Sequence, residues 1–128
     1  MLTSLCTVWV LSFVFQLTHE EYVTLLPKSI TTAIGMGLSQ DSGGYVTITV
    51  AVIILTGVLG NMFCEIICKL TGITHPVAKG IAIGTSSHAI GTARAMQLGE
   101  VEGAMSGLSI VISGIITLIG AQIFAGFI

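Results

Sequence analysis

Two long stretches without a charged side chain constrain this chain more than any other feature of its sequence. Residues 43–64 and 103–128 contain no Asp, Glu, Lys or Arg. Each stretch exceeds the roughly 20 residues that a helix needs to cross the hydrocarbon core of a bilayer. The sequence therefore predicts an all-α, polytopic membrane protein, in which residues 1–128 form a single integral membrane domain.

The composition supports a membrane environment and excludes a soluble nucleic-acid-binding domain. Charged residues make up 8% of the chain, against roughly 25% in ordinary soluble domains. The formal net charge is −2 and no basic cluster is present, so no nucleic-acid partner is expected. The apolar opening, residues 1–17, lacks the basic start and the small-residue cleavage site of a signal peptide. We predict a third membrane helix there.

The three cysteines do not form a recognisable metal or disulfide pattern. Cys6, Cys64 and Cys68 contain no C-x-x-C pair. Cys64 and Cys68 would share one helix face beside Glu65, which leaves a metal site as the alternative interpretation. Small polarizable cysteines also pack well in apolar helices, so we expect neither a metal nor another cofactor.

Two segments of mixed polarity separate the apolar ones. Each carries several glycines and hydroxyl side chains, and each is expected to be a glycine-broken or re-entrant helix. The expected order is an apolar helix at 1–17, a polar loop "THEEY" at 18–22, a mixed segment at 25–42, an apolar helix at 45–68, a second mixed segment at 75–99 and an apolar helix at 103–127.

An internal repeat is suggested when the chain is aligned with itself. "IILTG" at 53–57 matches "IVISG" at 110–114, and "TTAIG" at 31–35 matches "SHAIG" at 87–91 at nearly the same spacing. The repeat-like units would cover residues 25–68 and 75–128. If the mixed segments re-enter, each unit crosses the membrane once and the two units are inverted. If they cross as broken helices, the units run parallel.

Interrupted helices in a membrane protein indicate a binding site. Irregular backbone survives in a bilayer only where protein or a water-filled cavity satisfies its polar groups. Pro76 suits the first turn of a half-helix, which we expect to end at the break over residues 84–87. Ser86 or Ser87 would then cap the next half-helix, whose free N–H groups favour an anion.

The polar side chains of the second segment are expected to form two stripes along one cavity. Thr85, His88 and Thr92 would lie on one helix face, with Ser87 and Arg94 on a neighbouring one. His88 could carry a proton or contact a carboxylate, or could instead bond a backbone carbonyl as a neutral imidazole. Arg94 should either meet an anion or reach the membrane interface, with the interface favoured.

The first segment repeats this pattern after Pro27, although Lys28 could also serve as a snorkelling anchor. Gly80-x-x-x-Gly84 and Gly103-x-x-x-Gly107 are patterns that let helices approach closely. The predicted substrate-binding residues of the two segments are Lys28, Ser29, Thr31, Thr32, Thr85, Ser86, Ser87, His88, Thr92 and Arg94.

The blocks "LLPKSITTAIGMGLS" and "GTSSHAIGTARAMQLGEVEGAMSGL" resemble signature segments of the LrgB/CidB-like membrane proteins. The resemblance runs from Leu25 onward and implies a multi-pass protein of the bacterial plasma membrane. Family members carry further N-terminal membrane helices, so the chain resembles their C-terminal half. The family is described as antiholin-like regulators of murein hydrolase activity and autolysis that act with a small holin-like partner. Plastid relatives translocate glycolate and glycerate, and some bacterial pairs are implicated in pyruvate transport.

Two functions are therefore expected from the sequence, and neither is enzymatic. The first is transport of small monocarboxylates of the glycolate, glycerate and pyruvate class, through an anion site at the broken-helix N-termini. The alternative is an antiholin-like regulator that binds a small holin-like partner through its glycine faces. Partners would be the lipid bilayer and either the carboxylate substrate or the holin-like protein, and self-association is left open. A base and nucleophile at useful spacing are not evident in the sequence.

Overall fold

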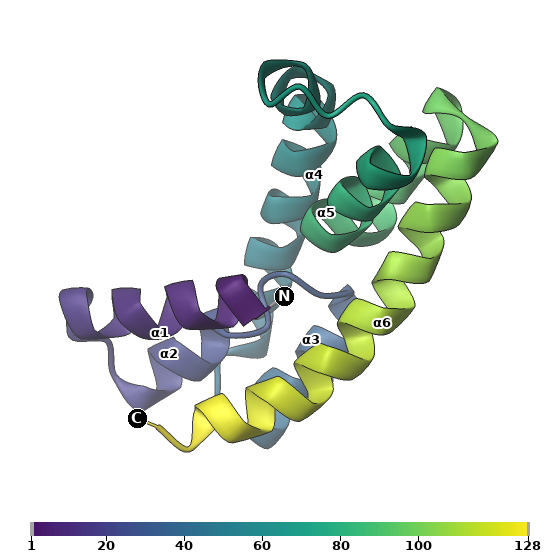
Figure 1. The fold of residues 1–128 in the computed structure, drawn as a ribbon. Coiled ribbons are helices and arrows are strands. Elements are labelled where there is room, and N and C mark those ends of the chain that lie inside the picture. The colour runs from purple at the N-terminus through teal and green to yellow at the C-terminus, as the bar shows by residue number, and fades with distance from the viewer. Residues whose placement is uncertain (1, 128) are drawn as a thin grey trace. The chain divides into compact units, whose positions relative to one another are not determined.

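The computed structural model describes residues 2–127, and these form six helices without any strand (Figure 1). The all-α expectation is therefore confirmed. The helices are α1 (Leu2–Phe15), α2 (His19–Leu25), α3 (Thr32–Asp41), α4 (Val46–Leu70), α5 (Pro76–Leu98) and α6 (Glu100–Ala125).

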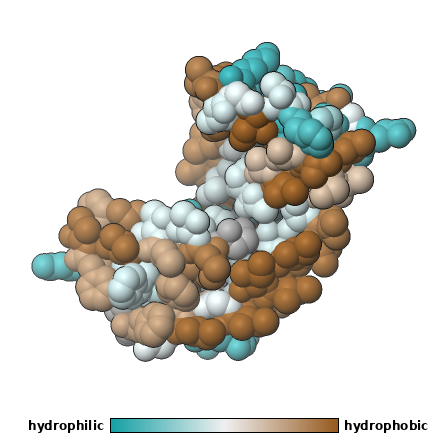
Figure 2. All heavy atoms as spheres, in the orientation of Figure 1, coloured by the Kyte–Doolittle hydropathy of each residue, from teal (hydrophilic) through white to brown (hydrophobic). Residues whose placement is uncertain are grey.

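Two helices, α4 and α6, are long and apolar enough to cross a membrane. Both expose many large apolar side chains, for example Met62 on α4 and Ile119 on α6. Figure 2 shows this hydrophobic surface in brown, with hydrophilic side chains in smaller teal groups. The third expected span is not confirmed, because α1 has only 14 residues, fewer than the roughly 20 that a span needs.

Helix α2 lies in a region for which the sequence analysis predicted a polar loop. The Thr18 hydroxyl accepts from the Glu21 backbone N–H at 3.3 Å, and the Glu21 carboxylate accepts from the Thr18 N–H at 2.9 Å. This reciprocal pair is a capping box, which starts a helix by satisfying two free N–H groups. The loop prediction for "THEEY" was therefore wrong.

The chain divides into two compact units, and each unit takes part of α4 and part of α6. The first unit contains residues 2–54 and 113–127, and the second contains residues 55–112. These units do not coincide with the repeat-like stretches 25–68 and 75–128, because each unit combines one mixed segment with portions of both long helices.

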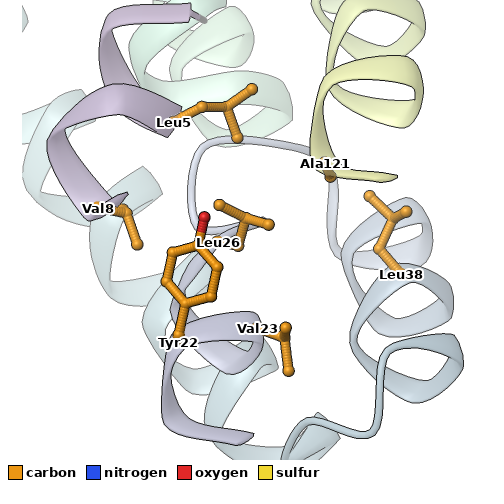
Figure 3. Close-up of a cluster of buried hydrophobic side chains, with 7 residues drawn as sticks. All are labelled: Leu5, Val8, Tyr22, Val23, Leu26, Leu38 and Ala121. Carbon is orange, nitrogen blue, oxygen red and sulfur yellow. The ribbon is translucent and has the colours of Figure 1, made fainter. Parts of the chain in front are cut away.

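The first unit has an apolar cluster built from four helices (Figure 3). The Tyr22 side chain is fully buried in this cluster, and its hydroxyl donates to the Phe124 carbonyl oxygen at 3.0 Å. Burial raises the pKa of Tyr22 to about 12. The cluster consists of Leu5, Val8, Tyr22, Val23, Leu26, Leu38 and Ala121.

Helices α2 and α3 form a hairpin that packs on the first half of α4. The α2 residue Thr24 lies at the start of α4, where its hydroxyl accepts from the Tyr45 N–H at 2.8 Å. Further along, Gly35 of α3 faces Ile53 of α4, with Ile30 beside it. Helix α2 is therefore parallel to α4, the chain turns at residues 26–31, and α3 returns antiparallel to α4.

Helix α5 is also a hairpin, because its direction reverses at His88. His88 has φ 47° and ψ −135°, which is not helical. A Cβ added at Gly91 would lie 2.9 Å from Ile83 Cγ2, although eight residues of straight helix would separate them by about 12 Å. Lys79 and Leu98, near the two ends of α5, line one cavity beside Lys69. Residues 76–87 and 89–98 are its first and second arms (Figure 1).

The breaks lie at other positions than the sequence suggested. Gly84, Ser86 and Ser87 are helical in the first arm of α5, and the reversal comes one residue later, at His88. In the first segment the break is the loop at residues 26–31, whereas Gly35 and Gly37 lie inside α3. Both segments are interrupted as expected, but not at their glycines. Pro76 does open α5 at its first turn, as predicted, while Pro27 lies in the loop instead of opening a helix.

Candidate functional site

The tip of the α5 hairpin gathers three of the predicted site residues, Ser86, Ser87 and His88. The Ser86 and Ser87 hydroxyl oxygens lie 3.1 Å apart, and the Ser87 and His88 side chains are almost fully buried. The positive φ of His88 is costly for a residue with a Cβ, and such strain is found where the surrounding packing enforces it. The tip is thus a tightly fixed polar turn.

The second arm of α5 begins directly after this turn. By the general rule for helix starts, its first N–H groups have no preceding turn to accept them and point toward the tip. Ser86 does not cap this arm as expected, because its hydroxyl donates back to the Ala82 carbonyl oxygen at 2.7 Å within the first arm. The half-helix N-terminus exists as predicted, but His88 occupies the position expected for a serine cap.

The predicted stripe of Thr85, His88 and Thr92 is wrong, because the reversal at His88 separates its members. Thr85 lies on the first arm and donates to the Ile81 carbonyl oxygen at 2.8 Å. Thr92 lies on the second arm, where its hydroxyl is 2.7 Å from the hydroxyl of Ser106 on α6. A helical periodicity cannot be continued across a turn that changes the direction of the chain.

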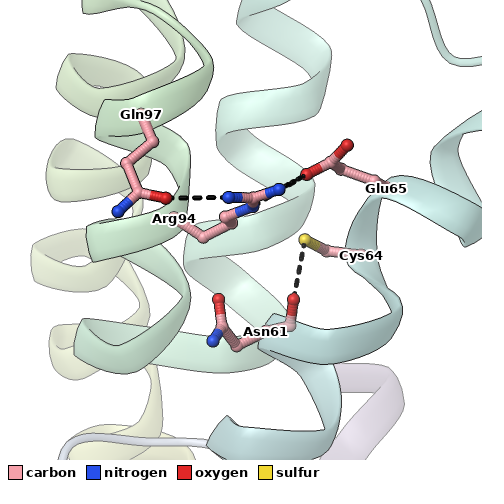
Figure 4. A network of polar contacts seen from close by, with 5 residues as sticks. All are labelled: Asn61, Cys64, Glu65, Arg94 and Gln97. Carbon is pink, nitrogen blue, oxygen red and sulfur yellow. Dashed lines mark hydrogen bonds and ion pairs between the residues drawn. The ribbon is translucent and has the colours of Figure 1, made fainter.

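Arg94 lies away from the tip and forms an ion pair with Glu65 on α4 (Figure 4). Its Nε donates to Glu65 Oε1 at 2.7 Å, and a terminal nitrogen donates to the Gln97 side-chain oxygen at 2.8 Å. The anion that Arg94 meets is therefore part of the protein. Sequence reasoning did not assign this role to Glu65, although opposite charges in neighbouring apolar helices were a usable signal.

The predicted residues of the first segment lie in or next to the loop at the α2–α3 tip. Lys28 Nζ is 3.4 Å from Ser29 Oγ, which is 2.8 Å from Ser4 Oγ on α1. Thr31 occupies the N-cap position of α3 and Thr32 is its first residue, so all four residues lie within one short stretch.

The glycine patterns separate into packed and open positions. Added Cβ atoms at Gly80 and Gly84 would collide with the Glu102 and Ser106 carbonyl oxygens, so these glycines let α5 approach α6 closely. The space beside Gly103 is likewise occupied, by Met96 of the second arm. Gly107 differs, because a Cβ there would meet nothing within 4 Å.

Gly107 lines an open groove on the second unit, between the end of α5 and the start of α6. The groove has a volume of about 500 Å³ and is mostly apolar. Its other lining residues include Met96, Ala104 and Leu108. Small residues along such a groove allow another helix to lie close to the α6 backbone.

The structure offers little to hold a metal. Within residues 2–127, His, Cys, Asp and Glu side chains do not come together in groups of three or more. Cys64 and Cys68 are buried on α4, and Cys64 Sγ lies 3.3 Å from the Asn61 carbonyl oxygen (Figure 4).

Comparison with known proteins identifies the family of this hairpin-containing chain. The model of the LrgB-like family matches residues 1–127. The chain belongs to the LrgB-like family. A relative named holin-like protein CidB, from Staphylococcus epidermidis, is 38% identical over 123 residues, covering 90% of this chain and 54% of the relative. The antiholin-like protein LrgB of Bacillus mycoides is 35% identical over 105 residues, covering 82% of this chain and 46% of the relative.

The chain spans about half the length of these LrgB-family relatives. No solved structure matches it. The family assignment confirms the resemblance recognised in the signature blocks, and these two relatives are named as holin-like and antiholin-like proteins.

Proposed function

We propose that the chain acts as an antiholin-type regulator in the bacterial plasma membrane, as part of an LrgB-family protein. In this role it would bind a small holin-like membrane partner and thereby control murein hydrolase activity and autolysis. The names of its relatives, holin-like CidB and antiholin-like LrgB, favour this function over the other candidate.

The open groove at Gly107 is the observation that supports a helix partner. The groove is apolar, belongs to a helix apolar enough to span the membrane, and presents backbone without a side chain at Gly107. Transmembrane helices associate through van der Waals contact at small residues, since lipid supplies no hydrophobic drive between them. A transmembrane helix of the holin-like partner would fit this surface.

The test is co-purification of the tagged chain with the holin-like partner from membranes, together with the rate of detergent-induced autolysis. Gly107→Leu fills the groove and is expected to abolish both association and control of autolysis. Gly37→Leu is the matched control, because Gly37 is also helical and has equal space around its Cβ position. Gly103→Leu is unsuitable, since Met96 already occupies that space. Retained association of the Gly107→Leu chain would contradict the proposal.

Transport of small monocarboxylates is the second candidate, and the α5 hairpin favours it. Half-helix N-termini beside hydroxyl groups suit a carboxylate, and interrupted helices at membrane depth form the substrate sites of many transporters. We propose that Ser86, Ser87 and His88 would contact the glycolate, glycerate or pyruvate carboxylate, with His88 as a proton-coupling group.

Uptake of labelled pyruvate or glycolate into vesicles containing the protein separates the two candidates. Transport predicts that Ser87→Ala and His88→Ala reduce uptake while Gly107→Leu does not. Regulation predicts the reverse pattern in the autolysis assay. Uptake equal to that of empty vesicles would remove the transport candidate.

We also infer that the two mixed segments are duplicated re-entrant hairpins. Two features support this: each hairpin has one arm parallel and one antiparallel to the helix that follows it, and buried hydroxyls at Thr49 and Ser106 occupy matching places. Each repeat would then cross the membrane once. In a chain without its natural cysteines, Thr71→Cys and Glu100→Cys should be labelled from the same side of the membrane. Labelling from opposite sides would mean that α5 crosses.

A further inference from the structure

A polar cavity lies in the second unit between α4 and the second arm of α5, apart from both the hairpin tip and the Gly107 groove. Its volume is about 460 Å³. Helix α4 contributes Asn61, Glu65 and Lys69, which follow one another at four-residue intervals and so share one face. The second arm contributes Arg94 and Gln97. Five polar side chains thus line one site in a largely apolar unit.

The charges in this cavity do not balance. Arg94 and Glu65 form an ion pair, and both remain partly exposed, at 42% and 32% of their side-chain surface. Lys69 lines the same cavity and is exposed. With two cations and one carboxylate, the cavity carries a net positive charge that suits an anionic ligand.

The position of the cavity indicates where that anion is held. Lys69 lies in the last turn of α4, a helix suited to crossing the membrane, so it lies where headgroups are expected. Next to the polar face, Met62 and Ile66 also line the cavity and are 63% and 52% exposed. The site thus combines a charged interior with an apolar rim on the surface that acyl chains would cover.

We propose that this cavity binds the phosphate group of an anionic phospholipid. Lys69 and Arg94 contact the phosphate, the Gln97 amide provides a further polar contact, and an acyl chain lies along Met62 and Ile66. Basic pockets between transmembrane helices recognise lipid headgroups in this way. Glu65 competes with the phosphate for Arg94 and therefore limits the affinity. This site is independent of both the partner groove and the hairpin tip.

Binding is measured with the full chain in neutral detergent micelles, using dihexanoyl-phosphatidylglycerol as the probe. Dihexanoyl-phosphatidylcholine tests the need for a net negative charge, and sn-glycerol 3-phosphate tests the need for acyl chains. Phosphatidylglycerol is expected to bind more tightly than either. Equal affinity for phosphatidylcholine would overturn the proposal, and equal affinity for glycerol phosphate would identify a site for soluble anions instead.

Two variants should change the affinity in opposite directions. Lys69→Gln is expected to weaken phosphatidylglycerol binding about fivefold, the effect of one basic residue near a membrane surface. Glu65→Gln removes the competing carboxylate and should tighten binding, a gain that misfolding cannot produce. Lys79→Gln is the control for the neighbouring cavity, which Lys69 and Glu65 also line but Arg94 does not. Equal weakening by Lys79→Gln, or no tightening by Glu65→Gln, would overturn the assignment.

Discussion

The Thr49 hydroxyl lies 2.8 Å from the Ser39 hydroxyl, and both side chains are completely buried in the first unit. The same Thr49 oxygen is 2.9 Å from the Thr24 carbonyl oxygen on α2. One side chain of α4 therefore contacts both arms of the first hairpin. In the second unit Ser106 of α6 does the same, with Thr92 on one arm and the backbone at Gly84 on the other.

Thr49→Val is expected to destabilise the chain by about 1 kcal/mol, because it keeps the shape of the side chain but leaves the Ser39 hydroxyl with one partner fewer. The free energy of unfolding is measured by SDS titration with circular dichroism. Thr47→Val on the exposed face of α4 is the control and should change stability little. Equal effects at the two positions would show that the buried hydroxyl does not secure the hairpin.

The long helices could be predicted from the sequence because uncharged length alone defines them. The helices predicted at 45–68 and 103–127 correspond to Val46–Leu70 and Glu100–Ala125 in the structure. Helix α2 was missed for a different reason. A single T-x-x-E pattern starts it, and that signal was outweighed by the polarity of "THEEY".

An interruption of α5 could be predicted from the sequence, but not the residue at which the chain reverses. Glycine at position 84 suggested a break there, yet this glycine is needed to bring the first arm against Ser106. His88 takes the unusual backbone conformation because Gly60 and Gly91 leave room for Ser87 beside the turn. Such contacts between distant residues are set by packing and are not encoded in any local window. The same holds for Glu65 and Arg94, which the fold brings together from two helices.

Glycine packing between α5 and α6 predicts different effects on stability for two glycine-to-alanine substitutions. Gly84→Ala places a methyl group against the Ser106 backbone and should destabilise the chain by about 1–3 kcal/mol. Gly107→Ala has open space and removes the helix cost of glycine, so stability should be unchanged or up to about 1 kcal/mol higher. SDS unfolding of both variants is the measurement. Destabilisation of equal size would contradict the close α5–α6 contact.

The pair of Tyr45 and Glu20 gives a prediction for alkaline titration. The Tyr45 hydroxyl donates to the Glu20 carboxylate at 2.6 Å, and this bond raises the pKa of Tyr45 above 10.0. Because the folded pKa is the higher one, the bond stabilises the chain below pH 10 and is lost as the pH rises through the folded pKa. Glu20→Gln should lower the tyrosinate midpoint, followed by absorbance at 295 nm in a Tyr22→Phe background.

Glu21→Gln is the control for this titration, because Glu21 acts on Tyr45 only through a weaker electrostatic effect. It should shift the midpoint less than Glu20→Gln does. A midpoint that does not respond to Glu20→Gln would mean that the hydrogen bond is absent in solution.

The turn at His88 predicts that glycine should be preferred to alanine within α5. In a regular helix alanine is more stable than glycine by about 1 kcal/mol. At His88 the φ of 47° penalises any residue with a Cβ, so His88→Gly should be more stable than His88→Ala by about 1 kcal/mol or more. Because both variants lose the imidazole, its contacts cancel in the comparison.

Ala93→Gly on the exposed, regular part of the second arm should show the ordinary preference for alanine. If alanine also proved more stable at position 88, α5 would have to be a continuous helix in solution, and the anion site at its tip would not exist.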